Sequence, residues 1–175
     1  MNQTILHTFW GIIMANQVFF TSHEQVKLVG ACASFRADIS LFIINAEDRE
    51  RFERIPAGEG IILVAEELQN SVESDELAAI IAHEQGHISC GHLEEIKRAQ
   101  MTGMIDNLRM ELEADAFAAN AVSQNAMLGG VKKAIKLVLT TVFTMHNVPR
   151  EDRPAIYRKV AEEMKPRFDA LRAAM

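Results

Sequence analysis

The stretch DELAAIIAHEQGHISCGH, residues 75–92, most strongly constrains the fold, because it joins an apolar helical pattern to three histidines and two glutamates. Its large apolar residues recur at helical spacing: Leu77, Ile80, Ile81 and Ile88. Ser71 or Ser74 can cap the start of such a helix, and Gly91 can end it. The stretch therefore predicts a half-buried helix that carries a row of polar side chains.

Two of these histidines are spaced for binding a metal ion. His83 and His87 are four residues apart, so on a helix they lie one turn apart on the same face. Two imidazoles so placed can bind one zinc ion, and Glu84 projects beside it, where it can take a proton from water. The alternative is a helix with surface histidines, but two half-buried neutral histidines would each need a partner. His92, five residues after His87, is expected to support the site or lie at the surface rather than bind metal.

A catalytic zinc site needs a third protein ligand, and the segment MELEADAFAANA, residues 110–121, offers carboxylates. Glu111 and Asp115 are four residues apart and share a helix face. Glu111 can then bind the metal, while Asp115 accepts the remaining N–H of a ligand histidine. Glu113 would point elsewhere. The alternative places all three acids in solvent, but the alanine-rich surroundings favour a closely packed helix.

The rest of the chain predicts one α+β domain over residues 1–175, mainly helical, with a small sheet near its N-terminus. β-branched and aromatic residues predict strands at 26–32, 39–46 and 61–65. Helices are expected over about 75–90, 104–122, 131–145 and 152–174. Gly129-Gly130 is expected to break the chain before the third of these helices, and Pro166 to kink the last. No internal repeat or linker divides the sequence.

Composition narrows the class of protein. The apolar and charged fractions, 49% and 24%, are ordinary for a globular protein, and the net charge of -6 gives no electrostatic reason to bind nucleic acid. Cys32 and Cys90 have no zinc-ribbon spacing, and two free thiols fit a reducing compartment. We therefore expect a cytoplasmic protein that binds no nucleic acid.

Residues 4–20 contain no charged side chain. The segment lacks the basic start of a signal peptide, and polar residues such as Asn16 and Gln17 interrupt it too often for a membrane span. Its apolar residues fall roughly on one helical stripe, which predicts an amphipathic helix packed on the domain. Membrane contact through this segment is the alternative.

The combination of DELAAIIAHEQGHISCGH and ELEAD resembles the gluzincin metallopeptidases of the HtpX and CAAX prenyl protease family, over roughly residues 55–160. The resemblance implies a zincin-like fold and a zinc-dependent endopeptidase with one zinc ion. It implies the following roles: His83, His87 and Glu111 as ligands, Glu84 as general base and Asp115 as the partner of a ligand histidine. It also implies that the strand at 61–65 is an edge along which extended polypeptide substrate pairs.

A weaker likeness to the same family lies in HNVPREDR, residues 146–153. Relatives often carry a His-Pro element followed by an arginine near the active site. That pattern implies that His146 and Arg153 stabilise the oxyanion, although the proline is displaced here. The alternative is a histidine at a helix end and a surface arginine. Many relatives also have several transmembrane helices, and this chain has no convincing one.

Other functions share parts of this pattern. LEADAFAA also resembles the ImmA-like regulatory metallopeptidases, which would use the same zinc and catalytic residues on a specific protein substrate. A non-catalytic zinc-binding protein would have a closed site with a fourth protein ligand. A helical interaction protein would bind no metal. A C-terminal helix lying in the cleft would give a self-inhibited enzyme.

Overall fold

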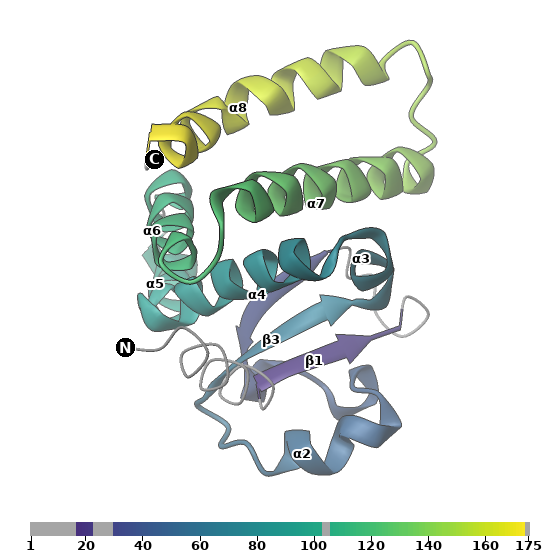
Figure 1. Ribbon diagram of the computed structural model, residues 1–175. Coiled ribbons are helices and arrows are strands. Elements are labelled where there is room, and N and C mark those ends of the chain that lie inside the picture. Colours follow the sequence, from purple (N-terminus) through teal and green to yellow (C-terminus); the bar gives the residue numbers. More distant parts are fainter. Residues whose placement is uncertain (1–16, 23–29, 103–105, 174–175) are drawn as a thin grey trace.

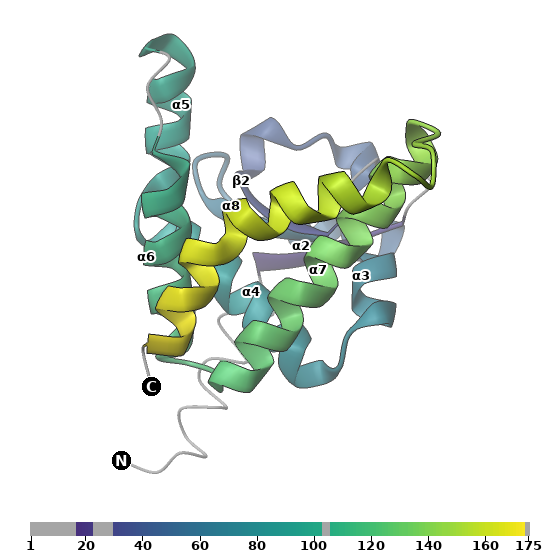
Figure 2. The ribbon, with the colours of Figure 1, turned by 90° about the horizontal axis from the view of Figure 1, so that it is seen from above.

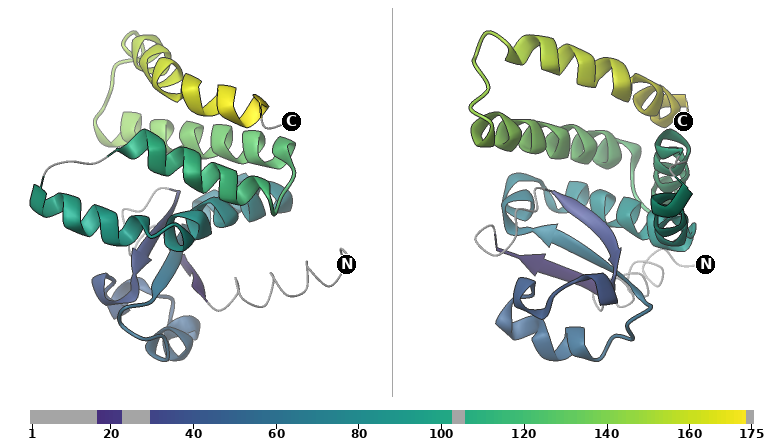
Figure 3. Two further views of the ribbon diagram at one scale, coloured as in Figure 1. Left: turned by 90° about the vertical axis from the view of Figure 1, so that its left-hand side faces the viewer. Right: turned by 180° about the vertical axis from the view of Figure 1, so that it is seen from behind.

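A three-stranded sheet and a stack of helices make up the computed structural model, which describes residues 17–22, 30–102 and 106–173. The strands are β1 (Val18–Thr21), β2 (Ala31–Phe35) and β3 (Gly60–Ala65), with short 3-10 turns between β2 and the first helix. The helices are α2 (Arg49–Glu53), α3 (Glu66–Ser71), α4 (Ser74–Ser89), α5 (His92–Thr102), α6 (Asn107–Ala119), α7 (Gln124–Met145) and α8 (Arg153–Ala173). The sheet lies between α2 and α4, and α7 and α8 follow beyond α4 (Figures 1 and 3).

β3 is the central strand, in the order β1-β3-β2, parallel to β1 and antiparallel to β2. All six of its residues are buried, because one face packs with Ile80 of α4 and the other with Phe19 and Phe52. Such two-sided burial explains the uninterrupted apolar run GIILVA. The strand at 61–65 is confirmed, but its expected role as an edge is wrong, because both of its sides are paired.

The other predicted elements before β3 are only partly confirmed. β2 begins at Ala31, later than the predicted strand, of which residues 26–29 lie outside the described residues. The strand at 39–46 is wrong: Leu41–Ile43 form a 3-10 turn, from which Ile44 enters the core. Residues 4–16 of the helix predicted at 4–20 lie outside the described residues. The prediction is wrong at residues 18–20, which belong to β1.

α4 begins and ends with specific local contacts. Glu73 is its N-cap and forms a capping box: the Glu73 side chain accepts the backbone N–H of Glu76, and the Glu76 side chain accepts the Glu73 N–H at 2.8 Å. The cap is therefore Glu73, and not Ser71 or Ser74. Gly91, with φ +76°, ends the helix as expected and allows α5 to start at once.

Glycines allow the helices next to α4 to approach it closely. A Cβ at Gly86 would lie 2.8 Å from Cα of Ala114 in α6, and a Cβ at Gly130 would lie 2.9 Å from the carbonyl oxygen of Glu76. The expected break at Gly129-Gly130 is wrong, because α7 runs through both residues and crosses the first turn of α4 there. The close approach brings α6 and α7 to the polar face of α4.

α8 returns along α7 and ends beside α6 (Figure 2). Leu171 near its end is buried in a cluster with Ala79, Ala118 and Met127. Pro166 lies inside α8, and the helix continues past it to Ala173. None of the helices in the described part of the chain has the length and apolar character to cross a membrane.

Candidate metal centre

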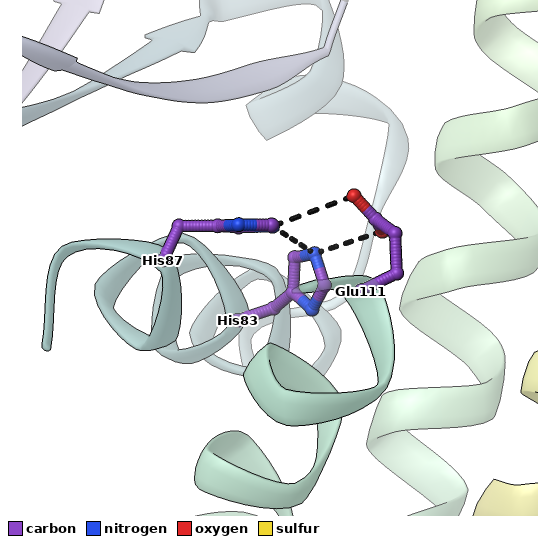
Figure 4. Close-up of side chains that lie close together, drawn as sticks. All are labelled: His83, His87 and Glu111. Atoms are coloured by element: carbon purple, nitrogen blue, oxygen red, sulfur yellow. Dashed lines mark hydrogen bonds and ion pairs between the residues drawn. The ribbon is translucent and has the colours of Figure 1, made fainter. Parts of the chain in front are cut away.

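Two histidines of α4 and a glutamate of α6 converge at one point (Figure 4). Nε2 of His83 lies 3.1 Å from Nε2 of His87 and 3.4 Å from Oε2 of Glu111. Nε2 of His87 lies 3.5 Å from Oε1 of Glu111. Tetrahedral zinc ligands at about 2.0–2.1 Å from the ion lie roughly 3.3 Å from one another. The three side chains therefore fit a single zinc ion.

Asp115 holds the first histidine in place. Nδ1 of His83 lies 2.8 Å from Oδ1 of Asp115, so the Nδ1–H donates to the carboxylate and Nε2 faces the other ligands. Both side chains are buried, with 9% and 4% exposed. Although burial lowers it, the hydrogen bonds to Asp115 and Glu111 raise the pKa of His83 to about 9. The imidazole of His83 therefore carries a second proton, on Nε2, at neutral pH when no metal ion is bound.

The two carboxylates of the site stay ionised. Burial acts to raise the pKa of Glu111, but the adjacent His83 and His87 imidazoles and the Arg167 guanidinium hold it well below its usual value. Burial opposes ionisation of Asp115 as well, and hydrogen bonds from Arg167 and His83 lower its pKa. A buried and a half-buried carboxylate beside imidazole nitrogens form a site that favours a cation.

Glu84 faces the neighbouring strand. Its Oε2 accepts the backbone N–H of Ala33 in β2 at 2.8 Å. The side chain lines a cavity of about 510 Å³ together with the three possible metal ligands and Arg167. The predicted base is thus brought to the same cavity as the predicted ligands.

Arg167 of α8 is a site residue that the sequence did not indicate. Its Nε and Nη2 donate to Oδ2 and Oδ1 of Asp115 at 2.7 and 2.8 Å, and its Nη1 lies 2.5 Å from Oε2 of Glu111. Only 12% of this side chain is exposed. One sequence signal existed: Arg167 stands four residues before Leu171, on the side of the helix that packs, and a buried arginine requires a carboxylate partner.

His146 and Arg153 are not brought to the site. His146 is the exposed residue at the end of α7, and Arg153, at the start of α8, donates to the carbonyl oxygen of Val148 at 3.1 Å and lies over the ring of Phe143. Leu139 is the last residue of α7 that lines the cavity, and His146 follows seven residues later, roughly 10 Å further along the helix axis. Both residues lie at the turn between α7 and α8, outside the lining of the cavity, and their expected oxyanion role stays a prediction.

His92 and Glu113 lie behind the metal ligands. His92 is fully buried and contacts His87, so it is not the surface residue that one interpretation allowed. Glu113 contacts His92 and Arg109 and, as expected, points away from the convergence point.

Comparison with known proteins gives one family. Residues 55–148, more than half of the chain, match Peptidase family M48, and the matched part contains His83, Glu84, His87, Glu111 and Asp115. No curated protein and no solved structure matches the chain. The HExxH histidine pair and the glutamate from α6 form the His/His/Glu metal-binding group of such an enzyme. The chain therefore belongs to Peptidase family M48, a family of metallopeptidase hydrolases.

Proposed function

We propose that this chain is a zinc-dependent endopeptidase in which His83, His87 and Glu111 bind one zinc ion. The spacing of the three ligand atoms, 3.1 to 3.5 Å, carries this proposal. Within residues 17–22, 30–102 and 106–173, the group of possible ligands has three members, and all three line the cavity. Three protein ligands and an open side are typical of catalytic zinc, whereas structural zinc sites are closed.

The residues around the site suit hydrolysis by activated water. A zinc ion held by His83, His87 and Glu111 would supply the positive charge that polarises the scissile carbonyl and acidifies the attacking water. Glu84 then takes the proton of that water and delivers it to the leaving amine. The Ala33 N–H already donates to Oε2 of Glu84, so Oε1 is the oxygen left to carry the proton. Asp115 keeps Nε2 of His83 directed at the site throughout.

We infer that the substrate pairs with β2 rather than with β3. The carbonyl oxygen of Gly30 accepts the backbone N–H of Ala65, and the backbone N–H of Arg36 donates to the carbonyl oxygen of Glu59, both at 2.8 Å. The backbone groups of the even-numbered residues of β2 therefore point toward β3. The alternation of an antiparallel pair then turns Ala31, Ala33 and Phe35 toward the free side. The bond from Ala33 to Glu84 supports this direction. An extended polypeptide paired there runs beside the proposed base.

The cavity walls favour an apolar side chain next to the scissile bond. Beyond its polar end, the cavity is lined by apolar residues of α5 and α7: Leu93, Ile96, Val131, Ile135, Val138 and Leu139. A large aliphatic or aromatic side chain would bury apolar surface here, at roughly 25 cal/mol per Å². We therefore expect polypeptide substrates with such a residue beside the cleaved bond.

We propose further that residues 1–175 form one domain and act in the cytoplasm. Contact of α8 with α6 and α7 supports the single domain, because the last helix completes the site of the earlier ones. Cys32 and Cys90 are free cysteines, which supports a reducing compartment.

Metal content and peptide hydrolysis test the proposal together. We expect one zinc per chain in the wild type and in Glu84→Gln, and less zinc in Glu111→Gln. Hydrolysis should fall by roughly 10²-fold or more in Glu84→Gln, because the proton acceptor is lost. Glu162→Gln, an exposed glutamate of α8, is the control and should match the wild type in both. A wild type that takes up no zinc, or a Glu84→Gln variant that cleaves normally, would overturn the proposal.

A further inference from the structure

His92 lies directly behind the second histidine of the proposed metal centre. His87 turns Nε2 toward His83 and Glu111, and its Nδ1 lies 3.0 Å from Nδ1 of His92. The two rings are 5.0 Å apart between centroids at 68°, and the His92 side chain has no exposed surface. Gly91 makes this contact possible, because its positive φ reverses the chain between α4 and α5.

The other side of His92 is anchored by charged groups. Its Nε2 lies 2.9 Å from Oε2 of Glu113, and Nη1 of Arg109 donates to both oxygens of Glu113 at 2.9 Å. Arg109 also contacts Glu95 of α5. A chain of hydrogen bonds thus runs from His87 through His92 and Glu113 to the surface ion pair of α5 and α6.

The number of donors and acceptors on each side chain sets the direction of these hydrogen bonds. An ionised glutamate only accepts, so His92 carries its hydrogen on Nε2 and donates it to Glu113. Nδ1 of His92 is then an acceptor, and Nδ1 of His87 must be the donor. His87 therefore keeps a free lone pair on Nε2, the atom that points at His83 and Glu111. A metal ligand needs that lone pair in that position.

We propose that His92 is a positioning residue of the metal centre, which holds His87 in its Nδ1–H tautomer with Glu113 as the anchor. This inference rests on the proposed role of His87 as a ligand. The two ligand histidines are then oriented by different hydrogen-bond partners. His83 donates to a carboxylate directly, whereas His87 donates to a second imidazole that in turn donates to a carboxylate.

Zinc affinity, measured by competition with a chromophoric chelator, is the first test. His92→Phe keeps an aromatic ring but offers His87 no acceptor, and it should weaken zinc binding by roughly 10- to 100-fold. His92→Asn places an amide oxygen near the former Nδ1 and should restore most of the affinity. Glu94→Gln, at an exposed position of α5, is the control and should bind zinc as the wild type does. Wild-type affinity in His92→Phe would overturn the proposal.

Imidazole nitrogen NMR of the metal-free wild type is the second test, and it depends neither on zinc nor on the folding of a variant. We expect the His92 proton on Nε2 and the His87 proton on Nδ1. A His92 proton on Nδ1 would overturn the inference even if zinc binds. A wild type that binds no zinc but shows the expected tautomers would overturn the proposed function and leave the hydrogen-bond chain standing.

Discussion

Arg167→Met is the substitution that most directly probes the balance of charge in the site. Methionine keeps an unbranched apolar stem but removes the three contacts that the guanidinium makes with Asp115 and Glu111. The Asp115 side chain is only 4% exposed, and breaking one side of a buried ion pair costs about 3–5 kcal/mol. Glu111 is 34% exposed and adds less. We therefore expect a loss near the lower bound, about 3 kcal/mol, in the metal-free protein.

In a chain of this size, a loss of about 3 kcal/mol corresponds to a fall in Tm of roughly 6–12 °C. The effect should be smaller in the zinc-loaded protein, because a bound cation takes over part of the compensation of Glu111. The substitution then raises the apparent zinc affinity instead of lowering it. If the substitution destabilises the metal-free protein by about 1.4 kcal/mol more than the zinc-loaded protein, zinc binds about tenfold more tightly.

Thermal unfolding with and without zinc, together with chelator competition, measures both effects. Lys165→Met, two residues earlier in α8, is the matched control, because its ion pair with Asp169 is exposed and contributes little to stability. A Tm within about 2 °C of the wild type would refute the argument that Arg167 compensates Asp115. Weaker zinc binding in Arg167→Met would refute the argument that the arginine and the metal compete for Glu111.

Three further predictions concern the proton, the packing and the substrate edge. Because the pKa of His83 is raised to about 9, its protonation stabilises the metal-free protein fully below pH 6.5, and this stabilisation is lost as the pH rises through about 9. Zinc affinity should therefore increase from pH 6.5 to about 9, and calorimetry should detect the protons that zinc binding releases. Gly86→Ala gains about 1 kcal/mol of helix propensity but places a Cβ 2.8 Å from the Ala114 backbone, at a cost of about 1–3 kcal/mol, so chemical denaturation should show net destabilisation. Ala33→Pro removes the free-edge N–H that Glu84 accepts, so the fold should persist while kcat/KM for peptides falls; an unchanged kcat/KM would place the substrate and the base elsewhere.

The residues proposed to bind zinc and to act chemically were largely predictable, because helical spacing places each pair of them on one face of its helix. His83 and His87 share a face of α4 by virtue of their four-residue separation, and Glu111 and Asp115 share a face of α6 for the same reason. β3 was also predictable, because a strand buried on both sides is apolar throughout.

Other features depend on contacts between distant segments and left at most a weak local signal. Gly129 and Gly130 look like a break, although they lie in α7 because α4 passes close to them. The strand β2, with the sequence ACASF, has weak strand character and exists because it pairs with β3. Arg167 joins the site across 52 residues of sequence, and no spacing rule links it to Asp115.

That separation has a consequence for the order in which the protein is made. Chains emerge at about 5–20 residues per second, so Arg167 follows Asp115 by about 3–10 seconds. Throughout that interval the histidines of α4 and the carboxylates of α6 have been synthesised, but Arg167, which pairs with Asp115 and Glu111, has not. A nascent chain is thus at its most electronegative around the ligand set just before α8 emerges, and metal loading at that stage meets no competing guanidinium.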